Sequence, residues 1–82
     1  MAMIKYYAPM RSIVGMETET VAAASIAEVL THIKTAHGKE AYKAAKSALI
    51  VVNDVSIGLY RGKKTALKKQ DTVGFLPLCG GG

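Results

Sequence analysis

The segment SIAEVLTHIKTAHG, residues 25–38, constrains the fold most because it carries both the ends and the buried stripe of one amphipathic helix. Ser25 and Glu28, three residues apart, form a capping-box pattern at its start. Gly38 stands where a helix-ending glycine belongs. The apolar residues recur at i, i+3, i+4 and i+7 as Ile26, Val29, Leu30 and Ile33. The sequence therefore predicts a helix near residues 25–37 that packs one face against an apolar surface.

Strand-like segments stand on both sides of this helix. Before the helix, one segment rich in β-formers and a second that alternates in polarity predict a β-hairpin. After the helix, residues 40–46 carry a shorter helical pattern. Asn53-Asp54 is a turn pair that ends the buried run ALIVV. The expected strands are residues 3–8, 17–22, 48–52, 55–60 (a weak strand interrupted by Gly58) and 72–78.

This order of elements predicts an α+β fold with one main helix packed across a mixed sheet of four to five strands. The chain has 82 residues, half of them apolar, which suffices for a single core. If the first and last strands are parallel neighbours at the centre of the sheet, the arrangement is a β-grasp, or ubiquitin-like, fold. We expect one domain over residues 1–78 and a flexible tail over residues 79–82.

Composition narrows the classes of function. The net charge of +5 favours an acidic partner, or else forms a solvated basic surface. No aromatic residues interleave with the lysine pairs 63–64 and 68–69, so direct nucleic-acid binding is not expected. No apolar run approaches the roughly 20 residues of a membrane span. Cys79 is the only cysteine, which excludes an intrachain disulfide and favours a cytoplasmic location.

The sequence ends in FLPLCGGG, a stretch whose glycines have no side chain to bury. Glycine loses more conformational freedom on ordering than any other residue. A terminal glycine run is therefore either an idle end or a segment that must be thin and mobile in order to act.

Three segments of the chain carry a resemblance to a known family. They are IKYYAPMRSIVG, LIVVND and KKQDTVGFLPLCGGG. Together they resemble the small subunit of molybdopterin synthase, one of the MoaD/ThiS-like ubiquitin-like sulfur carriers. Gly81 and Gly82 match the terminal Gly-Gly pair of that family, and Arg11 matches a family arginine. Phe75-Leu76 stands where the family has two aromatic residues, and Pro77 is followed by Leu78 in place of a second proline.

The resemblance implies a protein that is not catalytic alone. Gly82 would be adenylated by an activating enzyme, which uses ATP, and then converted to a thiocarboxylate; Gly81 would keep the tail narrow. The sulfur would pass to a larger synthase subunit in molybdopterin (molybdenum or tungsten cofactor) biosynthesis, after delivery by a sulfur donor protein. No cofactor is expected on the domain itself. Apolar residues near the root of the tail would dock the partner, namely Leu59, Phe75 and Leu76.

Two alternatives remain open at this point. The sulfur could serve another product, such as thiamine thiazole, cysteine or thiolated tRNA. The protein could instead be a ubiquitin-like modifier joined to other proteins through its C-terminus. Both alternatives share the adenylation step, and the sequence separates them poorly.

The remaining candidate residues carry no expected chemistry. His32 and His37 are five residues apart and are not expected to share a helix face, so no metal site is predicted. Cys79 is interpreted as a filler or an exposed thiol, because nothing near it in sequence indicates a lowered pKa. Nucleotide-binding glycine motifs are absent, which leaves ATP to the activating partner.

Overall fold

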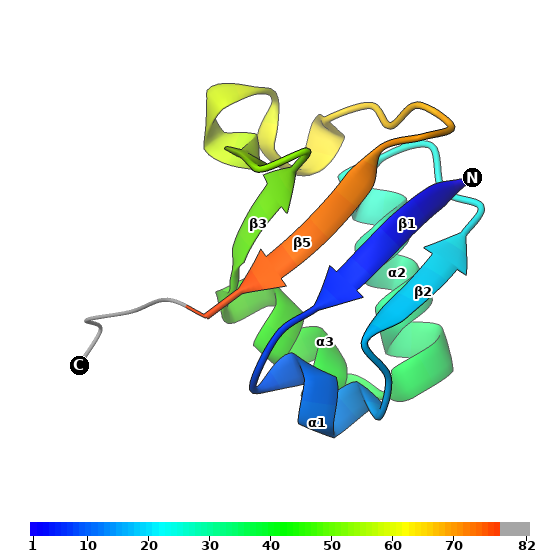
Figure 1. Ribbon diagram of the computed structural model, residues 1–82, viewed down its shortest axis with the longest axis vertical. Helices are drawn as coiled ribbons and strands as arrows, with labels where there is room; N and C mark the ends of the chain where they lie inside the picture. The colour runs from blue at the N-terminus through cyan, green and yellow to red at the C-terminus, as the bar shows by residue number, and fades with distance from the viewer. Residues whose placement is uncertain (78–82) are drawn as a thin grey trace.

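A mixed sheet in the order β2-β1-β5-β3-β4 forms one layer of the computed structural model, which describes residues 1–77 (Figure 1). The neighbours β1 and β5 are parallel, and every other pair is antiparallel. This confirms the predicted β-grasp fold with its first and last strands side by side. The strands are β1 Ala2–Tyr6, β2 Thr18–Val21, β3 Leu49–Val52, β4 Val55–Ser56 and β5 Thr72–Leu76.

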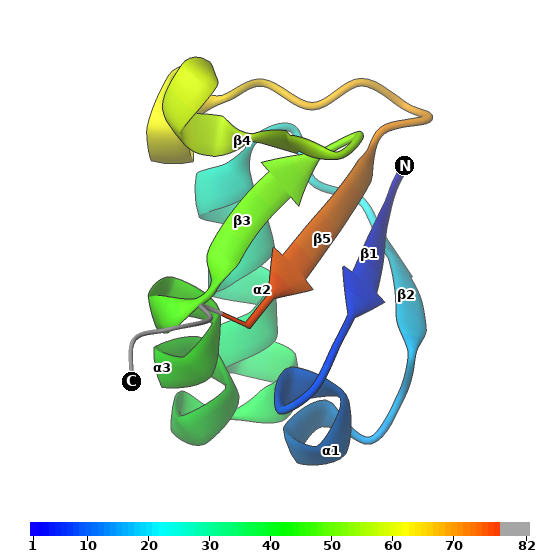
Figure 2. The same ribbon diagram turned by 60° about the vertical axis from the view of Figure 1, so that its left-hand side comes forward.

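Helices α2 and α3 form a second layer against one face of the sheet, and α1 lies at the lower end of β1 (Figure 2). The helices are α1 Met10–Val14, α2 Ile26–His37 and α3 Lys39–Ser47, with short 3-10 turns η1 Ile57–Leu59 and η2 Gly62–Lys64. The predicted capping box is present, because the Ser25 Oγ accepts a hydrogen bond from the Glu28 N–H at 3.3 Å. Gly38 ends α2 at a φ of 95°, a conformation that favours glycine. None of the helices within residues 1–77 has the length and apolar character needed to cross a membrane.

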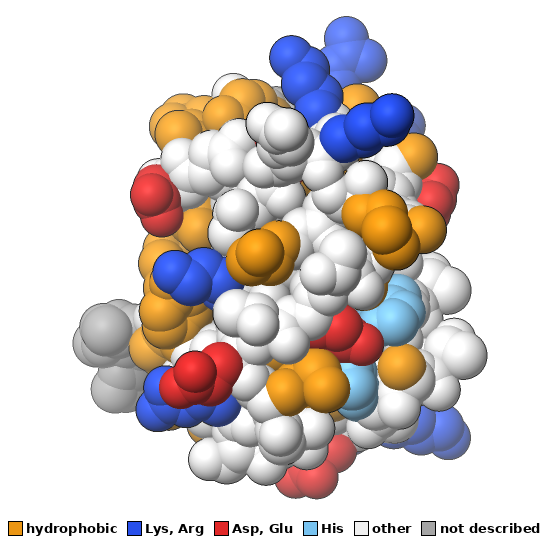
Figure 3. Space-filling model, turned by 45° about the vertical axis from the view of Figure 1, so that its right-hand side comes forward, with side chains coloured by type: hydrophobic (Ala, Val, Ile, Leu, Met, Phe, Trp, Pro, Cys, Tyr) orange, Lys and Arg blue, Asp and Glu red, His pale blue; other side chains and the backbone are white. Residues whose placement is uncertain are grey.

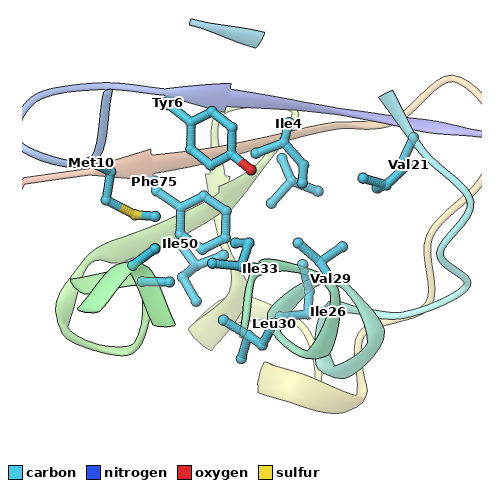
Figure 4. Close-up of a cluster of buried hydrophobic side chains, with 14 of the residues drawn as sticks. Ile4, Tyr6, Met10, Val21, Ile26, Val29, Leu30, Ile33, Ile50 and Phe75 are labelled. Carbon is cyan, nitrogen blue, oxygen red and sulfur yellow. The ribbon is translucent and has the colours of Figure 1, made fainter. Parts of the chain in front are cut away.

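The core lies between these two layers (Figure 4). Strand alternation sends Ile4, Tyr6 and Phe75 toward the helices, and the predicted α2 stripe meets them from the other side. Tyr6 and Phe75 are stacked with ring centroids 6.2 Å apart. The stripe residues Ile26, Val29, Leu30 and Ile33 are all buried, as the sequence predicts.

Three segments differ from the prediction. The first hairpin is interrupted by α1, which buries only Met10 and is too short to show a helical period in the sequence. The weak strand expected over residues 55–60 continues only to Ser56, whose Oγ then accepts from the Gly58 N–H and starts η1. The last strand ends at Leu76, before Pro77, which has no N–H to donate to the sheet.

Candidate functional site

The last strand, β5, is held on both sides at the centre of the sheet. Phe75 pairs with Tyr6 of β1, and Leu76 pairs with Leu49 of β3. Pro77 therefore continues directly from a strand whose end is fixed by two neighbours. Leu78 and the residues of the expected tail, Cys79, Gly81 and Gly82 among them, lie outside the described residues. The structure thus positions the strand that leads to the expected reactive end.

A pair of polar side chains joins the turn before β5 to the turn after β3. The Asn53 amide donates to the Asp71 carboxylate at 2.9 Å, and its Oδ1 accepts from the Thr72 N–H at 3.0 Å. Asp71 also accepts from the Lys68 N–H at 2.8 Å. These hydrogen bonds, that of Lys68 first, hold the pKa of the Asp71 carboxyl below its usual range. The turn after β3 and the turn before β5 are therefore hydrogen-bonded to each other.

Replacement of Asn53 tests this connection. Asn53→Ala removes both amide hydrogen bonds and places a less suited residue at a φ of 51°, so we expect a loss of about 2 kcal/mol in unfolding free energy. Asn53→Gly accepts the positive φ and loses only the hydrogen bonds, so we expect about 1 kcal/mol. Urea denaturation measures both values. Wild-type urea midpoints for both variants would show that Asn53 does not hold the turns together.

The face of the sheet opposite the helices carries an apolar patch over its centre. A methyl group added to Gly74 would lie 3.0 Å from Cγ2 of Val51 and 3.6 Å from Cε2 of Tyr7. Because Gly74 has no side chain, Val51 and Tyr7 can approach each other over β5. Leu49 and Leu76 continue the patch, because their pairing places them on the same face. Tyr7, Leu49, Val51 and Leu76 are called the open-face patch below. Its position beside the end of β5 gives a partner apolar contact next to the outgoing chain.

The three residues predicted to dock a partner do not lie together. Phe75 is only 1% exposed and belongs to the core, so it offers a partner almost no surface. Alternation explains this, since Phe75 and Leu76 are neighbours in a strand and point to opposite faces. Leu76 is half-buried in the open-face patch. Leu59 is 79% exposed and lies on η1. Leu76 pairs with the first residue of β3, whereas η1 follows the other end of that strand.

An apolar hollow of about 280 Å³ lies at the end of β5. Phe75, Leu76 and Pro77 form one wall of this hollow. The other walls come from the connection between β1 and α1 and from α3, chiefly through small side chains: Ala8, Pro9, Met10, Ala44, Ser47 and Ala48. Together with the open-face patch, it places apolar surface beside Pro77, the last described residue.

Two histidines meet a glutamate at the other edge of the sheet. The sequence predicts that His32 and His37 do not share a helix face, but their ring centroids are only 5.9 Å apart. Both rings reach the carboxylate of Glu19 on β2. Sequence spacing alone could not show this, since the glutamate comes from a different element. Arg11, the residue matched to a family arginine, is exposed on α1 and lies 3.7 Å from Glu17.

Comparisons with known proteins agree with this geometry. The sequence model of the ThiS family matches residues 4–82. A comparison with curated proteins finds no match.

Among solved structures, the small archaeal modifier protein 1 of Methanosarcina acetivorans is 23% identical and has a TM-score of 0.79. The alignment covers 99% of this chain and 95% of that chain. A putative molybdopterin converting factor subunit 1 of Pyrococcus furiosus is 24% identical, with a TM-score of 0.74 and coverage of 93% and 94%. A chain of the Amycolatopsis orientalis BexX/CysO complex is 18% identical, with a TM-score of 0.84 and full coverage of both chains. These structures share the fold.

Proposed function

This chain belongs to the ThiS family of ubiquitin-like sulfur carriers, and from that membership we propose that it carries sulfur as a thiocarboxylate on Gly82. The observation that supports the proposal most is the match of the family over residues 4–82, which includes the glycine run. The position of β5 supports it further, because a reactive end beyond a central strand is presented from a rigid base.

The proposed reaction has two steps. An oxygen of the Gly82 carboxylate attacks the α-phosphorus of ATP on an activating enzyme, and pyrophosphate leaves. Sulfide, supplied by a sulfur donor protein, then attacks the carbonyl carbon, and AMP leaves with the electrons of the broken C–O bond. No oxidation state changes at the carbon. Narrow residues such as Gly81 let the carboxylate enter a buried site on the partner, at an ordering cost of about 1–2 kcal/mol per residue.

The contact with the activating enzyme offsets this ordering cost. We assign that contact to the open-face patch, because it is apolar, is partly exposed and lies beside the end of β5. Leu49 is 38% exposed and Leu76 is half-buried, so both can lose further surface on docking. A larger synthase subunit would use the same surface, since it must receive the same tail.

A charged substitution in the open-face patch tests whether this patch contacts the activating enzyme. We expect Leu49→Asp to weaken binding of the activating enzyme by about tenfold or more, because the complex would bury an unpaired carboxylate. Met16→Asp is the control: Met16 is 39% exposed and lies between α1 and β2, away from β5. Binding is measured by calorimetry, with circular dichroism as the check of folding. Equal losses for the two variants would remove the patch from the docking surface.

We propose that the pterin precursor of molybdopterin accepts the sulfur carried by this protein. The opening segment, with Arg11 and Gly15 between the first two strands, resembles the molybdopterin synthase small subunit, and the Pyrococcus furiosus factor shares the fold. Conjugation to protein lysines is the second candidate, favoured by the fold shared with an archaeal modifier protein.

A transfer assay separates these two acceptors. The sulfur-loaded protein is mixed with a molybdopterin synthase large subunit and the pterin precursor, and the dithiolene product is followed by mass spectrometry. Product formation with loss of the loaded sulfur supports the pterin. A separate incubation with activating enzyme, ATP and lysine-bearing proteins tests conjugation; isopeptide products there, with no dithiolene in the first assay, would support the modifier.

A further inference from the structure

Glu19, His32 and His37 place three potential metal-binding atoms within 4.8 Å of one another. The His32 Nε2 lies 2.9 Å from Oε2 of Glu19, and the His37 Nε2 lies 2.8 Å from Oε1. Glu19 comes from β2, the edge strand that β1 separates from β5, whereas both histidines come from α2. The cluster is therefore distinct from β5 and from the open-face patch.

The packing around the cluster limits how the ligands can move. The Tyr6 hydroxyl donates to Oε1 of Glu19 at 2.8 Å, and the Tyr6 ring lies edge-on to the ring of His37 at 6.2 Å. Burial, and after it this contact with Glu19, raises the pKa of Tyr6 above its usual value, so the hydroxyl remains a donor. A hydrogen bond from a neighbour to a ligand atom is the usual second layer of a protein metal site.

The cluster is also open enough to admit an ion. The side chain of His32 is 33% exposed, and those of Glu19 and His37 are less exposed but not buried. Figure 3 shows both histidines of the chain at the surface, next to acidic side-chain atoms. All three side chains of the cluster are thus partly exposed to solvent.

The charge at the cluster favours a cation. Within residues 1–77, the ion pairs of Glu19 are only those with the two imidazoles, and no lysine or arginine lies within salt-bridge distance of it. No fixed cation within the described residues therefore competes with a metal ion for this carboxylate.

We propose that Glu19, His32 and His37 bind one divalent transition-metal ion, with Zn²⁺ as the best fit. Two imidazoles and one carboxylate form a known three-ligand zinc set, which leaves a fourth position for water. Zinc ligands lie about 2.0–2.2 Å from the ion, so the present short contacts would open slightly around it. Each imidazole would bind through Nε2 and carry its proton on Nδ1. The ion would link the edge strand β2 to the last turns of α2.

Zinc titration of the tag-free protein tests the site. All proteins carry Cys79→Ser, because a thiol would bind zinc by itself. In calorimetry we expect one equivalent of Zn²⁺ to bind, and we expect His32→Gln and His37→Gln each to weaken binding about tenfold or more. Glu17→Gln is the matched control, since Glu17 is an exposed acid two residues from Glu19; we expect its affinity to stay within about twofold of the parent.

Nuclear magnetic resonance of the histidine ring nitrogens identifies the ligand atoms directly. Addition of Zn²⁺ should move the Nε2 signals of both His32 and His37 and leave both Nδ1 atoms protonated. Circular dichroism shows whether each variant remains folded. The proposal is overturned if the parent shows no saturable zinc binding, or if both folded histidine variants bind zinc as tightly as the parent.

Discussion

Deletion of Gly82 is expected to abolish sulfur loading without changing the stability of the domain. The proposed mechanism places both adenylation and sulfur on this one carboxylate, so a chain ending at Gly81 presents its carboxylate one residue short of the partner's reactive centre. The hydrogen bonds and core contacts described here lie within residues 1–77 and remain in the shortened protein. Loading with activating enzyme, ATP and a sulfur source is followed by intact mass, and stability by thermal denaturation.

Two further tail variants serve as comparisons for this deletion. One residue added after Gly82 should also prevent loading, because the acyl group to be activated would no longer belong to glycine. Gly81→Phe should slow loading by steric block while Gly82 is still present. A Gly82 deletion that accepts sulfur at the wild-type rate would show that the reactive group lies elsewhere in the chain.

Phe75→Ala is expected to cost about 3–5 kcal/mol of unfolding free energy, the largest stability effect that we predict. Phe75 is among the largest fully buried side chains, stacks on Tyr6 and comes from the central strand, so its removal leaves a cavity between the two layers. For a domain of this size, such a loss lowers the melting temperature by more than about 12 °C. Thermal denaturation measures the shift.

Two milder variants keep this prediction testable if Phe75→Ala does not fold. Phe75→Leu retains most of the volume and should cost roughly 1–2 kcal/mol. Leu76→Ala removes a half-buried side chain on the opposite face and should cost about 1 kcal/mol. A loss for Leu76→Ala as large as that for Phe75→Ala would contradict the placement of Phe75 alone in the core.

The sequence predicted the parts of the fold that local chemistry specifies. The α2 helix carries its own start signal, buried stripe and ending glycine, and the structure confirms each of them between Ser25 and Gly38. The Asn53-Asp54 turn was equally clear, since both residues take the positive φ that these side chains tolerate best. The parallel pairing of β1 with β5 was a hypothesis that comes with the β-grasp arrangement, and the structure confirms it.

The sequence did not predict features that depend on contacts between distant elements. Phe75 and Leu76 are both apolar, and only the register of β5 decides which of them faces the core. The helix α1 has five residues and no side-chain cap at its start, so only Gly15, at its end, marks it in the sequence. Glu19 stands 13 residues before His32 and 18 before His37, and only the packing of β2 against α2 brings them together.

The mass of the sulfur-loaded protein, with fragmentation to locate the change, tests the central proposal most directly. The protein and its Cys79→Ser variant are each incubated with activating enzyme, ATP and a sulfur source. A thiocarboxylate replaces one oxygen by sulfur, so we predict a gain equal to the difference between these two atoms, located on Gly82 and present in both proteins. A gain of a whole sulfur atom on Cys79, absent from the variant, would instead show a persulfide on the thiol and contradict the proposal.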